Sequence, residues 1–361
     1  MREPMVSILW LNYNSSSFMD VALESLEGVM DLDYSNYELM IVDNCSTDRS
    51  FNAIRGFIEK RMSAKDVKVI RLDKNVGFTG GNNVAYRARN HESKYVVFLN
   101  NDAIPYSNSL RKLIECMESD DSLGALEGIF LDYDGRTVQG AGNYIGELLT
   151  TYSLHSPLSR LHYVTYACGT YSVNRVSSIR RAVERDDLIF DEHMFAYYDD
   201  HILGLKMWNT NSKVAAFPVI AARHKGSASF GRIRPIQAYL QAKGLATLNE
   251  ISNSRYKELI KPLLIDVYAH TMLENGILGR YVARSMRSLS VAILKGFSDG
   301  VRIGRKKRRM GETIDLYKAP IARLSLPTII GLIPGIQFSG RVMEKLNQTI
   351  FHGLYENPRD Q

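Results

Sequence analysis

The sequence predicts an α/β fold: a doubly wound, Rossmann-like mixed sheet followed by a mainly α-helical C-terminal region. Over the first hundred residues, apolar segments of strand length alternate with amphipathic segments of helical length. This strand, helix, strand order is typical of a parallel sheet with helices packed on its faces. From Tyr256 to Phe297 the apolar residues instead follow a helical period, with Lys and Arg beside them.

Three of the predicted strands end in clusters of Asn, Asp and Ser. Strands are expected at residues 5–11, 37–42 and 95–99, and helices at residues 18–30 and 51–62. The polar residues that follow the strands are Asn12 and Asn14, then Asp43, Asn44 and Ser46, then Asn100, Asn101 and Asp102. Because crossovers return every strand's carboxyl end to one side, we expect these residues at one sheet edge, where ligands bind in open α/β sheets. Ser46 has an alternative role as a cap of the helix that follows.

A Gly- and Asn-rich segment lies between the second and third of these strands. It contains Asn75, Gly77, Gly80, Gly81 and Asn82. We interpret it as a loop in which missing Cβ atoms let backbone N–H groups approach an anion such as a diphosphate. The alternative is an ordinary loop without a ligand. Neither a Walker loop nor a dinucleotide fingerprint is present.

Six segments together resemble the family 2 glycosyltransferases of the GT-A fold, in their rhamnosyltransferase-like group. The segments are LNYN, IVDNCSTDRS, NVGFTGGNN, FLNNDAIP, FDEHMFAYYDDHILGLKMW and RHKGSASFG, in this order. The resemblance implies that a sugar is transferred from a nucleotide diphosphate to a hydroxyl group, with inversion at the anomeric carbon. We expect the acceptor to be a glycan or a lipid-linked glycan.

The resemblance also implies roles for single residues at the donor end of the site. Asp102 would hold Mg²⁺ or Mn²⁺ as the last residue of the family's acidic motif, with Asn100 in its first position, although it could instead be a turn residue. His224 would approach the metal or the diphosphate, or be structural. The segment from Asn75 to Asn82 would line the nucleotide and diphosphate. Asn12 and Asp43, with the polar residues that follow each of them, would hold the base and ribose.

For the acceptor, the resemblance makes Asp200 the general base, with Asp199 beside it. The alternative is that both are acids placed at a helix N-terminus, where the helix dipole favours them. This chain has Lys206 where the family often has Arg, which removes a bidentate contact.

Length and charge divide the chain in two. We expect a catalytic domain at residues 1–231 and a helical region at residues 232–361. From Arg223 to Arg309 there are 18 Lys and Arg against 5 Asp and Glu, a net charge of +13, whereas the other residues sum to −7. Amphipathic helices with such charge predict peripheral docking on an anionic membrane, on its cytoplasmic face. A packed helical domain with a solvated basic surface is the alternative.

Other features exclude several classes of protein. Leu324–Gly340 is uncharged but has only 17 residues and two prolines, which favours an interfacial segment or a packed tail over a membrane span. Three cysteines without a CxxC motif indicate neither a disulfide framework nor a zinc site, and no export signal is visible. A non-catalytic scaffold subunit remains as an alternative, and nucleic-acid binding through the basic C-terminal region is a second, less favoured one. No nucleic acid is expected as a partner, because the basic region lacks a recognisable nucleic-acid-binding motif.

Overall fold

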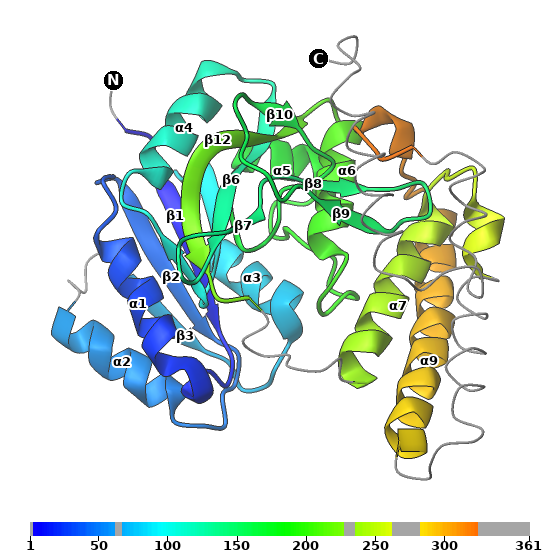
Figure 1. Ribbon diagram of the computed structural model, residues 1–361, viewed down its shortest axis with the longest axis horizontal. Helices are drawn as coiled ribbons and strands as arrows, with labels where there is room; N and C mark the ends of the chain where they lie inside the picture. Colours follow the sequence, from blue (N-terminus) through cyan, green and yellow to red (C-terminus); the bar gives the residue numbers. More distant parts are fainter. Residues whose placement is uncertain (1–2, 62–66, 227–234, 262–281, 324–361) are drawn as a thin grey trace. The chain divides into compact units, whose positions relative to one another are not determined.

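The computed structural model describes residues 3–61, 67–226, 235–261 and 282–323, with no side-chain description for residues 282–287 (Figure 1). The chain divides into two compact units, Met1–Asn143 with Ser153–Gly231, and Tyr144–Tyr152 with Arg232–Gln361. The short segment Tyr144–Tyr152 thus groups with the later residues, which the sequence does not indicate. The expected domain boundary at residue 231 lies outside the described residues and stays a prediction.

The first unit is built on one mixed sheet. Within its described residues the strands follow the order β10-β12-β6-β11-β4-β1-β2-β3, with β5 beside β12 and β7 beside β6. The strands are β1 (Val6–Asn12), β2 (Tyr37–Asp43), β3 (Val67–Arg71), β4 (Tyr95–Asn100), β5 (Ala103–Pro105), β6 (Leu123–Asp132), β7 (Val138–Gly140), β10 (His162–Tyr163), β11 (Tyr171–Arg175) and β12 (Lys213–His224). A separate two-stranded sheet pairs β8 (Asn143–Ile145) with β9 (Thr151–Ser153).

Helices pack on this sheet as the alternating sequence predicts. They are α1 (Met19–Met30), α2 (Ser50–Arg61), α3 (Gly77–Ala88), α4 (Ser109–Ser119), α5 (Val176–Val183) and α6 (Asp199–Asn209), with a 3₁₀ turn η1 (Ser16–Phe18). Strands β1, β2, β3 and β4 run parallel, and β11 runs antiparallel between β4 and β6. The predicted α/β class and mixed sheet are therefore confirmed.

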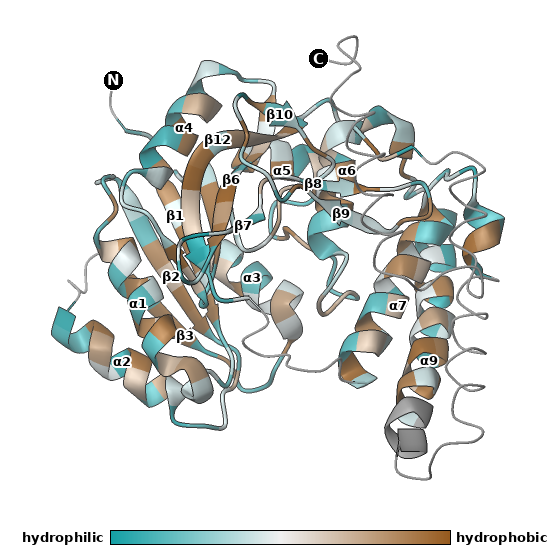
Figure 2. Ribbon diagram, viewed as in Figure 1, coloured by the Kyte–Doolittle hydropathy of each residue, from teal (hydrophilic) through white to brown (hydrophobic). Residues whose placement is uncertain are grey.

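The central strands are buried on both faces, so they read as continuous apolar runs. Ile8 and Trp10 of β1 belong to one core cluster, while Phe98 of β4 packs its ring 5.0 Å from that of Phe190. Figure 2 shows the strands as the most hydrophobic part of this unit, with mixed polarity on the helices around them. Burial on both faces is typical of strands covered by crossover helices.

The interpretation of the Gly- and Asn-rich segment as a loop is wrong. Residues Gly77–Ala88 form the helix α3. Glycine weakens a helix by about 1 kcal/mol relative to alanine, so propensity favoured a loop. Close packing overrides propensity here, because a Cβ on Gly81 would lie 2.4 Å from Cδ1 of Leu11 and one on Gly80 would lie 2.7 Å from Val76.

The second unit contains two packed helices, α7 (Pro235–Ile251) and α9 (Val282–Arg309), and a 3₁₀ turn η2 (Leu316–Lys318). Gly296, Gly300 and Gly304 occur once per turn along α9, on the face that meets α7. A Cβ on Gly300 would lie 2.3 Å from the carbonyl oxygen of Lys243, so the backbones approach closely only because side chains are missing.

The structure describes only some of the predicted amphipathic helices. The helix α9 continues through the basic residues 305–309, while residues 262–281 and the segment Leu324–Gly340 lie outside the described residues. None of the helices in the described ranges combines the length and hydrophobicity that a membrane span requires.

Candidate functional site

Three strand ends meet at one edge of the sheet, as the sequence predicts. In the parallel register Asn12 of β1 lies opposite Asp43 of β2, and Leu11 lies opposite Asn100 of β4. This edge brings most of the predicted polar residues together.

Asn12 is the centre of a buried hydrogen-bond network at this edge. Its side-chain amide donates to Oδ1 of Asp43 (2.8 Å) and to the hydroxyls of Ser46 and Ser50 (3.1 Å each). Ser46 donates in turn to Asp43 (2.6 Å), and Asn101 donates to Oδ1 of Asn12 (3.3 Å). Asn12 and Asp43 are almost fully buried. In this structure they stabilise the loops at the strand ends, and their contact with a base or ribose stays a prediction.

Asn14 joins the same loops through its backbone and side chain. Its N–H donates to the Ser46 hydroxyl (3.0 Å), and its Oδ1 accepts from the N–H of Thr47 (2.8 Å). Asn14 adopts a left-handed backbone (φ 48°), which Asn tolerates better than most residues.

The N-terminus of α3 is fixed by two predicted asparagines. Asn44 donates to the carbonyl of Gly77 (3.0 Å) and accepts from the N–H of Val76 (2.9 Å), while Oδ1 of Asn75 accepts from the N–H of Gly77 (2.8 Å). Gly77 has φ +78°, and a Cβ there would lie 2.3 Å from the carbonyl oxygen of Phe195. Only glycine therefore fits at this position.

The other predicted residues of this segment lie inside the helix. Asn82 donates to the carbonyl of Phe78 one turn earlier (2.9 Å), and Gly80 and Gly81 make room for neighbouring side chains. Asn83, beside them, holds the backbone of Ile189 and Phe190 through three hydrogen bonds of 2.8–3.0 Å. This part of α3 positions the segment that leads to the acid pair, and its contact with a diphosphate stays a prediction.

Asp102 and His224 lie side by side although they are far apart in the sequence. The short strand β5 pairs with the end of β12, with Ala103 opposite His224. This pairing places Nε2 of His224 3.2 Å from Oδ1 of Asp102, and both side chains are about 15% exposed. The N–H of Lys225 donates to the carbonyl of Asp102 (3.0 Å) and closes the turn.

Gln139 fixes the orientation of the His224 ring. Its side-chain amide nitrogen donates to the carbonyl of His224 (3.3 Å), so its oxygen faces Nδ1 of the ring at 2.6 Å. Nδ1 therefore carries a proton, and in a neutral ring Nε2 would direct its lone pair at the Asp102 carboxylate. The lone pair of Nε2 and the negative carboxylate repel each other. A cation or a proton between these two atoms removes the repulsion, and a cation in this place is the usual arrangement around a metal-binding histidine.

Asp102 and His224 supply only some of the ligands that a divalent ion needs. No group of three or more His, Cys, Asp or Glu side chains in the described ranges could hold a metal ion by itself. Mg²⁺ and Mn²⁺ sites often use one or two protein ligands together with substrate phosphates. Asp102 and His224 fit such a site, which a diphosphate would complete.

The acid pair begins the helix α6. Asp199 is buried, and Asp200 is about one-fifth exposed. Oδ1 of Asp200 accepts from the N–H of His201 (2.9 Å) and lies against the ring nitrogen Nδ1 of the same histidine, while Oδ2 accepts from the N–H of Gly169 (3.3 Å). The ring of His201 stacks on Tyr166 at 4.0 Å.

The two neighbouring acids have opposite pKa shifts. Burial, and then the charge of Asp200, raise the pKa of Asp199 well above its usual value, which favours its protonated form. Burial alone would also raise the pKa of Asp200, but the charge and hydrogen bonds of His201 and the N–H of Gly169 outweigh it and lower this pKa. Asp200 is therefore the ionised member of the pair.

A short segment, Cys168–Thr170, connects the acid pair to the end of β4. The N–H of Gly169 reaches Asp200, and the carbonyl of Thr170 accepts from the N–H of Asn100 (2.9 Å). A Cβ on Gly169 would lie 2.9 Å from the ring of Phe78 in α3. The same three residues thus hold two parts of the site: the strand end that carries Asn100 and Asp102, and the start of α6.

Sequence reasoning missed several residues that build this site. They are Glu127, Asn143, Gln139 and His201. Glu127 had a recognisable signal, because it is the one charged residue between Leu123 and Leu131, a run that otherwise reads as a buried strand. Asn143 and Gln139 had none, since their partners lie elsewhere in the chain, whereas His201 directly follows the predicted acid pair.

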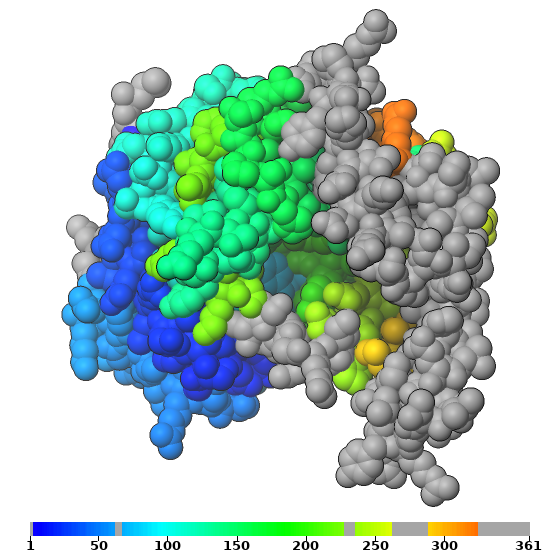
Figure 3. Space-filling view, in the orientation of Figure 1, coloured from blue at the N-terminus to red at the C-terminus, as the bar shows by residue number. Residues whose placement is uncertain are grey.

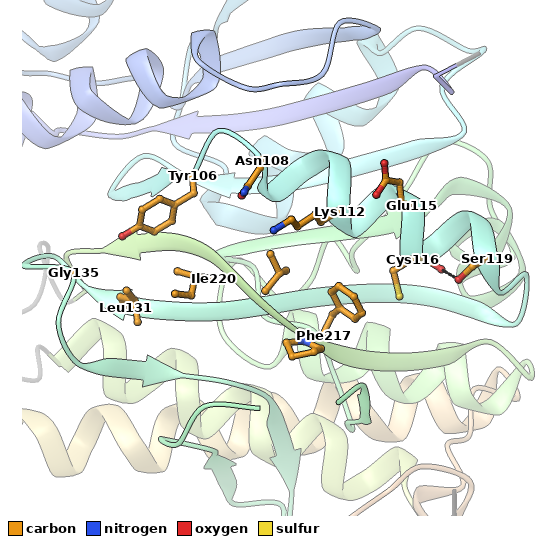
Figure 4. Close-up of a pocket in the computed structure, with 12 residues that line it drawn as sticks. Tyr106, Asn108, Lys112, Glu115, Cys116, Ser119, Leu131, Gly135, Phe217 and Ile220 are labelled. Atoms are coloured by element: carbon orange, nitrogen blue, oxygen red, sulfur yellow. Dashed lines mark hydrogen bonds between the residues drawn. The ribbon is translucent and has the colours of Figure 1, made fainter. Parts of the chain in front are cut away.

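Two further surface features contain none of the predicted site residues. A groove of about 890 Å³ lies between α4 and the bulged middle of β12, lined by Tyr106, Lys112, Phe217 and Ile220 among others (Figure 4).

In the space-filling view, the N-terminal segment and residues near 130 share one face (Figure 3). Glu24 of α1 accepts hydrogen bonds from the Tyr133 hydroxyl (2.8 Å) and from Arg223 (2.5 Å).

A family model and several curated relatives match part of the chain. A model described as "Glycosyl transferase family 2" matches residues 7–182. TuaG of Bacillus subtilis (strain 168) is 27% identical over 117 residues, which is 32% of this chain and 42% of that protein. The matches to curated relatives span less than half the length of those proteins.

Solved structures share the fold. The mannosyltransferase PcManGT from Pyrobaculum calidifontis, in complex with GDP-Man and Mn²⁺, aligns with a TM-score of 0.50 and 14% identity over 100% of this chain and 89% of its own. GalNAc-T7 with UDP, GalNAc and Mn²⁺ aligns with a TM-score of 0.54 and 11% identity over 87% of this chain and 59% of its own. The predicted GT-A fold is confirmed.

Proposed function

Because this chain belongs to glycosyl transferase family 2, we propose that it transfers a sugar from a nucleotide diphosphate to a hydroxyl group of a glycan or lipid-linked glycan. The transfer proceeds with inversion and with the help of Mg²⁺ or Mn²⁺. One observation carries the proposal: the ionised Asp200 and the strand end that leads to Asp102 are held to the same segment, Cys168–Thr170.

Asp200 is the general base of the proposed reaction. Its carboxylate accepts the proton of the acceptor hydroxyl as the oxygen attacks the anomeric carbon and the bond from that carbon to the diphosphate breaks. The lowered pKa keeps Asp200 ionised and ready to accept. Asp199 stays protonated, so the site carries one negative charge at this point rather than two.

Asp102 and His224 hold the donor end. They would hold a divalent ion together with the diphosphate, and the ion would supply positive charge that stabilises the leaving group. Gln139 keeps the lone pair of His224 directed toward that position, and Asn44 and Asn75 fix the nearby N-terminus of α3. Asn12, Asp43 and Ser46 support the loops that would contact the base and ribose.

The basic end of α9 is the proposed membrane-docking surface, on the cytoplasmic face. Lys306, Arg308 and Arg309 are exposed there, whereas Lys307 forms an ion pair with Glu312 (2.9 Å) and Arg305 lies 3.8 Å from Glu250. Exposed cations of this kind attract anionic lipids by about 1 kcal/mol each.

A donor panel tests the proposed activity. Purified protein is incubated with UDP-GlcNAc, UDP-galactose, GDP-mannose and dTDP-rhamnose, and the released nucleotide diphosphate is measured with Mn²⁺, Mg²⁺ or EDTA. We expect release from one donor class, lost in EDTA and reduced by at least 100-fold in Asp102→Ala. Full activity of Asp102→Ala or of the EDTA sample contradicts the role of the metal, and no release from any donor with a membrane lipid extract as acceptor contradicts the transferase proposal.

A further inference from the structure

Glu127 is a carboxylate enclosed in the middle of the sheet. It lies in β6 opposite Ser172 of β11 and Ala216 of β12, and its side chain is fully buried. Burying an ionisable group costs several kcal/mol unless hydrogen bonds compensate. The residues around Glu127 therefore indicate what holds it there.

Asn143 and Cys168 supply those hydrogen bonds. The side-chain amide of Asn143 donates to both carboxylate oxygens of Glu127 (2.9 and 3.0 Å), and the backbone N–H of Cys168 donates to Oε2 (2.9 Å). Oδ1 of Asn143 accepts from the hydroxyl of Ser153 (2.7 Å), which fixes the direction of the amide. Asn143 thus holds the carboxylate on one side, and on the other side the carboxylate accepts a hydrogen bond from the backbone of Cys168.

The next N–H along that backbone binds Asp200. Cys168 donates to Glu127 and Gly169 donates to Oδ2 of Asp200 (3.3 Å), so two consecutive amides connect the two carboxylates. A side chain at position 169 would collide with the ring of Phe78, so the peptide lies close against α3 only because residue 169 is glycine. Moving the Glu127 carboxylate would move the donor that faces Asp200.

We propose that Glu127 is a positioning residue for Asp200, acting through the Cys168–Gly169 peptide. The inference rests on the proposed role of Asp200 as the base. Glu127 itself touches no reacting atom. It holds the N–H of Gly169 on Asp200, and it places a second carboxyl group close enough to interact with the charge of that residue.

The ionisation of Glu127 makes this link sensitive to pH. Burial raises its pKa to about 7, and the charge of Asp200 adds to the rise, while the hydrogen bonds from Cys168 and Asn143 oppose it. Tyr166 and Cys168 also interact electrostatically with Glu127, but burial raises both of their pKa values, so they remain neutral. Loss of the proton from Glu127 near neutral pH should therefore strengthen the hydrogen bond that Glu127 accepts from the Cys168–Gly169 segment.

A single NMR signal can report on this peptide. Cys168–Gly169 is the only Cys-Gly pair in the sequence. In full-length protein labelled with ¹³C at the cysteine carbonyl and ¹⁵N in glycine, a carbonyl-to-amide correlation spectrum shows one peak, from Gly169. In wild-type protein the amide shift should titrate with a midpoint near 7. Glu127→Gln should move the peak and remove the titration.

Two variants act as controls. Glu38→Gln makes the same change at another buried carboxylate, in β2, which accepts from Ser7 (2.6 Å). It should leave the Gly169 titration unchanged. Asn143→Ala keeps Glu127 but removes a hydrogen bond that lowers its pKa, so the midpoint should move to higher pH. This second variant tests the proposal even if Glu127→Gln does not fold.

Kinetics provide a second readout. With the best donor of the panel and water as acceptor, Glu127→Gln should lower kcat about tenfold, with the donor KM unchanged, because small displacements of a catalytic group are costly. Glu38→Gln should keep wild-type kcat. A Gly169 titration identical in wild type and Glu127→Gln overturns the proposal. Full activity in Asp200→Asn overturns the base assignment instead, and the two failures are therefore distinguishable.

Discussion

Asp199 and Asp200 are adjacent in the chain, but their surroundings differ. Asp199 is enclosed and its pKa is raised, whereas Asp200 has His201 on one oxygen and the N–H of Gly169 on the other. Burial, and then repulsion from Asp200, raise the pKa of Asp199, whereas the pKa of Asp200 is lowered. The assignment of the base to Asp200 stays a prediction, and two measurements at this scale bear on it.

Replacing each acid by its amide tests their roles. Asp200→Asn keeps the shape but cannot accept a proton, so kcat should fall by about 10²-fold or more with donor affinity nearly unchanged. Asp199→Asn should cost much less, because Asp199 is already neutral. Steady-state kinetics with the best donor give both values, and the reverse order would move the base to Asp199.

Asp199 should also make stability depend on pH. In the unfolded chain it loses its proton near pH 3.9, but in the folded protein it keeps the proton to higher pH because its pKa is raised. The folded state therefore loses stability relative to the unfolded state as pH rises above about 4. Asp199→Asn removes this loss, so its Tm advantage over wild type should grow from pH 4 to pH 7 in thermal unfolding. A difference in Tm that stays constant over this range would contradict the raised pKa.

At the scale of elements, glycines decide how helices approach their neighbours. In α3 they let the helix lie against Leu11 of β1, and in α9 they let two backbones come into contact. Gly56 in α2 is different, since no atom lies within 4 Å of a Cβ added there. The sequence shows all of these residues simply as glycines.

This contrast predicts opposite effects of the same substitution. Gly300→Ala should destabilise the second unit, because the new Cβ meets the Lys243 carbonyl oxygen at 2.3 Å and Ala246 at 2.8 Å, and overpacking costs about 1–3 kcal/mol. Gly56→Ala should stabilise the first unit by about 0.5–1 kcal/mol, because alanine favours a helix. Urea unfolding monitored by circular dichroism measures both, and a stabilised Gly300→Ala would show that the helices are not in close contact.

On the scale of the whole molecule, charge is strongly uneven. The net +13 of residues 223–309 stands against −7 for the other residues. Acidic side chains in the second unit neutralise part of the cluster at the end of α9, as the Lys307–Glu312 ion pair shows. Docking on a membrane therefore depends on the exposed cations that remain.

Three of these cations give a specific test. Replacing Lys306, Arg308 and Arg309 by Gln should weaken co-sedimentation with phosphatidylserine-containing vesicles several-fold, without changing release of the nucleotide diphosphate. The control replaces Arg49, Lys60 and Arg61 of the first unit, which removes the same charge. Binding should also fall with salt, because the Debye length is about 10 Å at 0.1 M. Equal binding to neutral and acidic vesicles, or none to either, would contradict membrane docking.

The sequence by itself determined the α/β class, the positions of the central strands and the resemblance to family 2 glycosyltransferases, because these depend on local periodicity and on motif order. It also determined that Asn12, Asp43 and Asn100 meet at one edge, since parallel topology alone brings strand ends together. Only the tertiary structure decided the rest. Packing against Leu11 makes the Gly-rich segment a helix, and the pairing of β5 with β12 places His224 on Asp102. Burial raises the pKa of Asp199 and of Glu127, whereas contacts with His201 and the N–H of Gly169 lower that of Asp200. A linear pattern contains neither the burial nor the contact with Gly169.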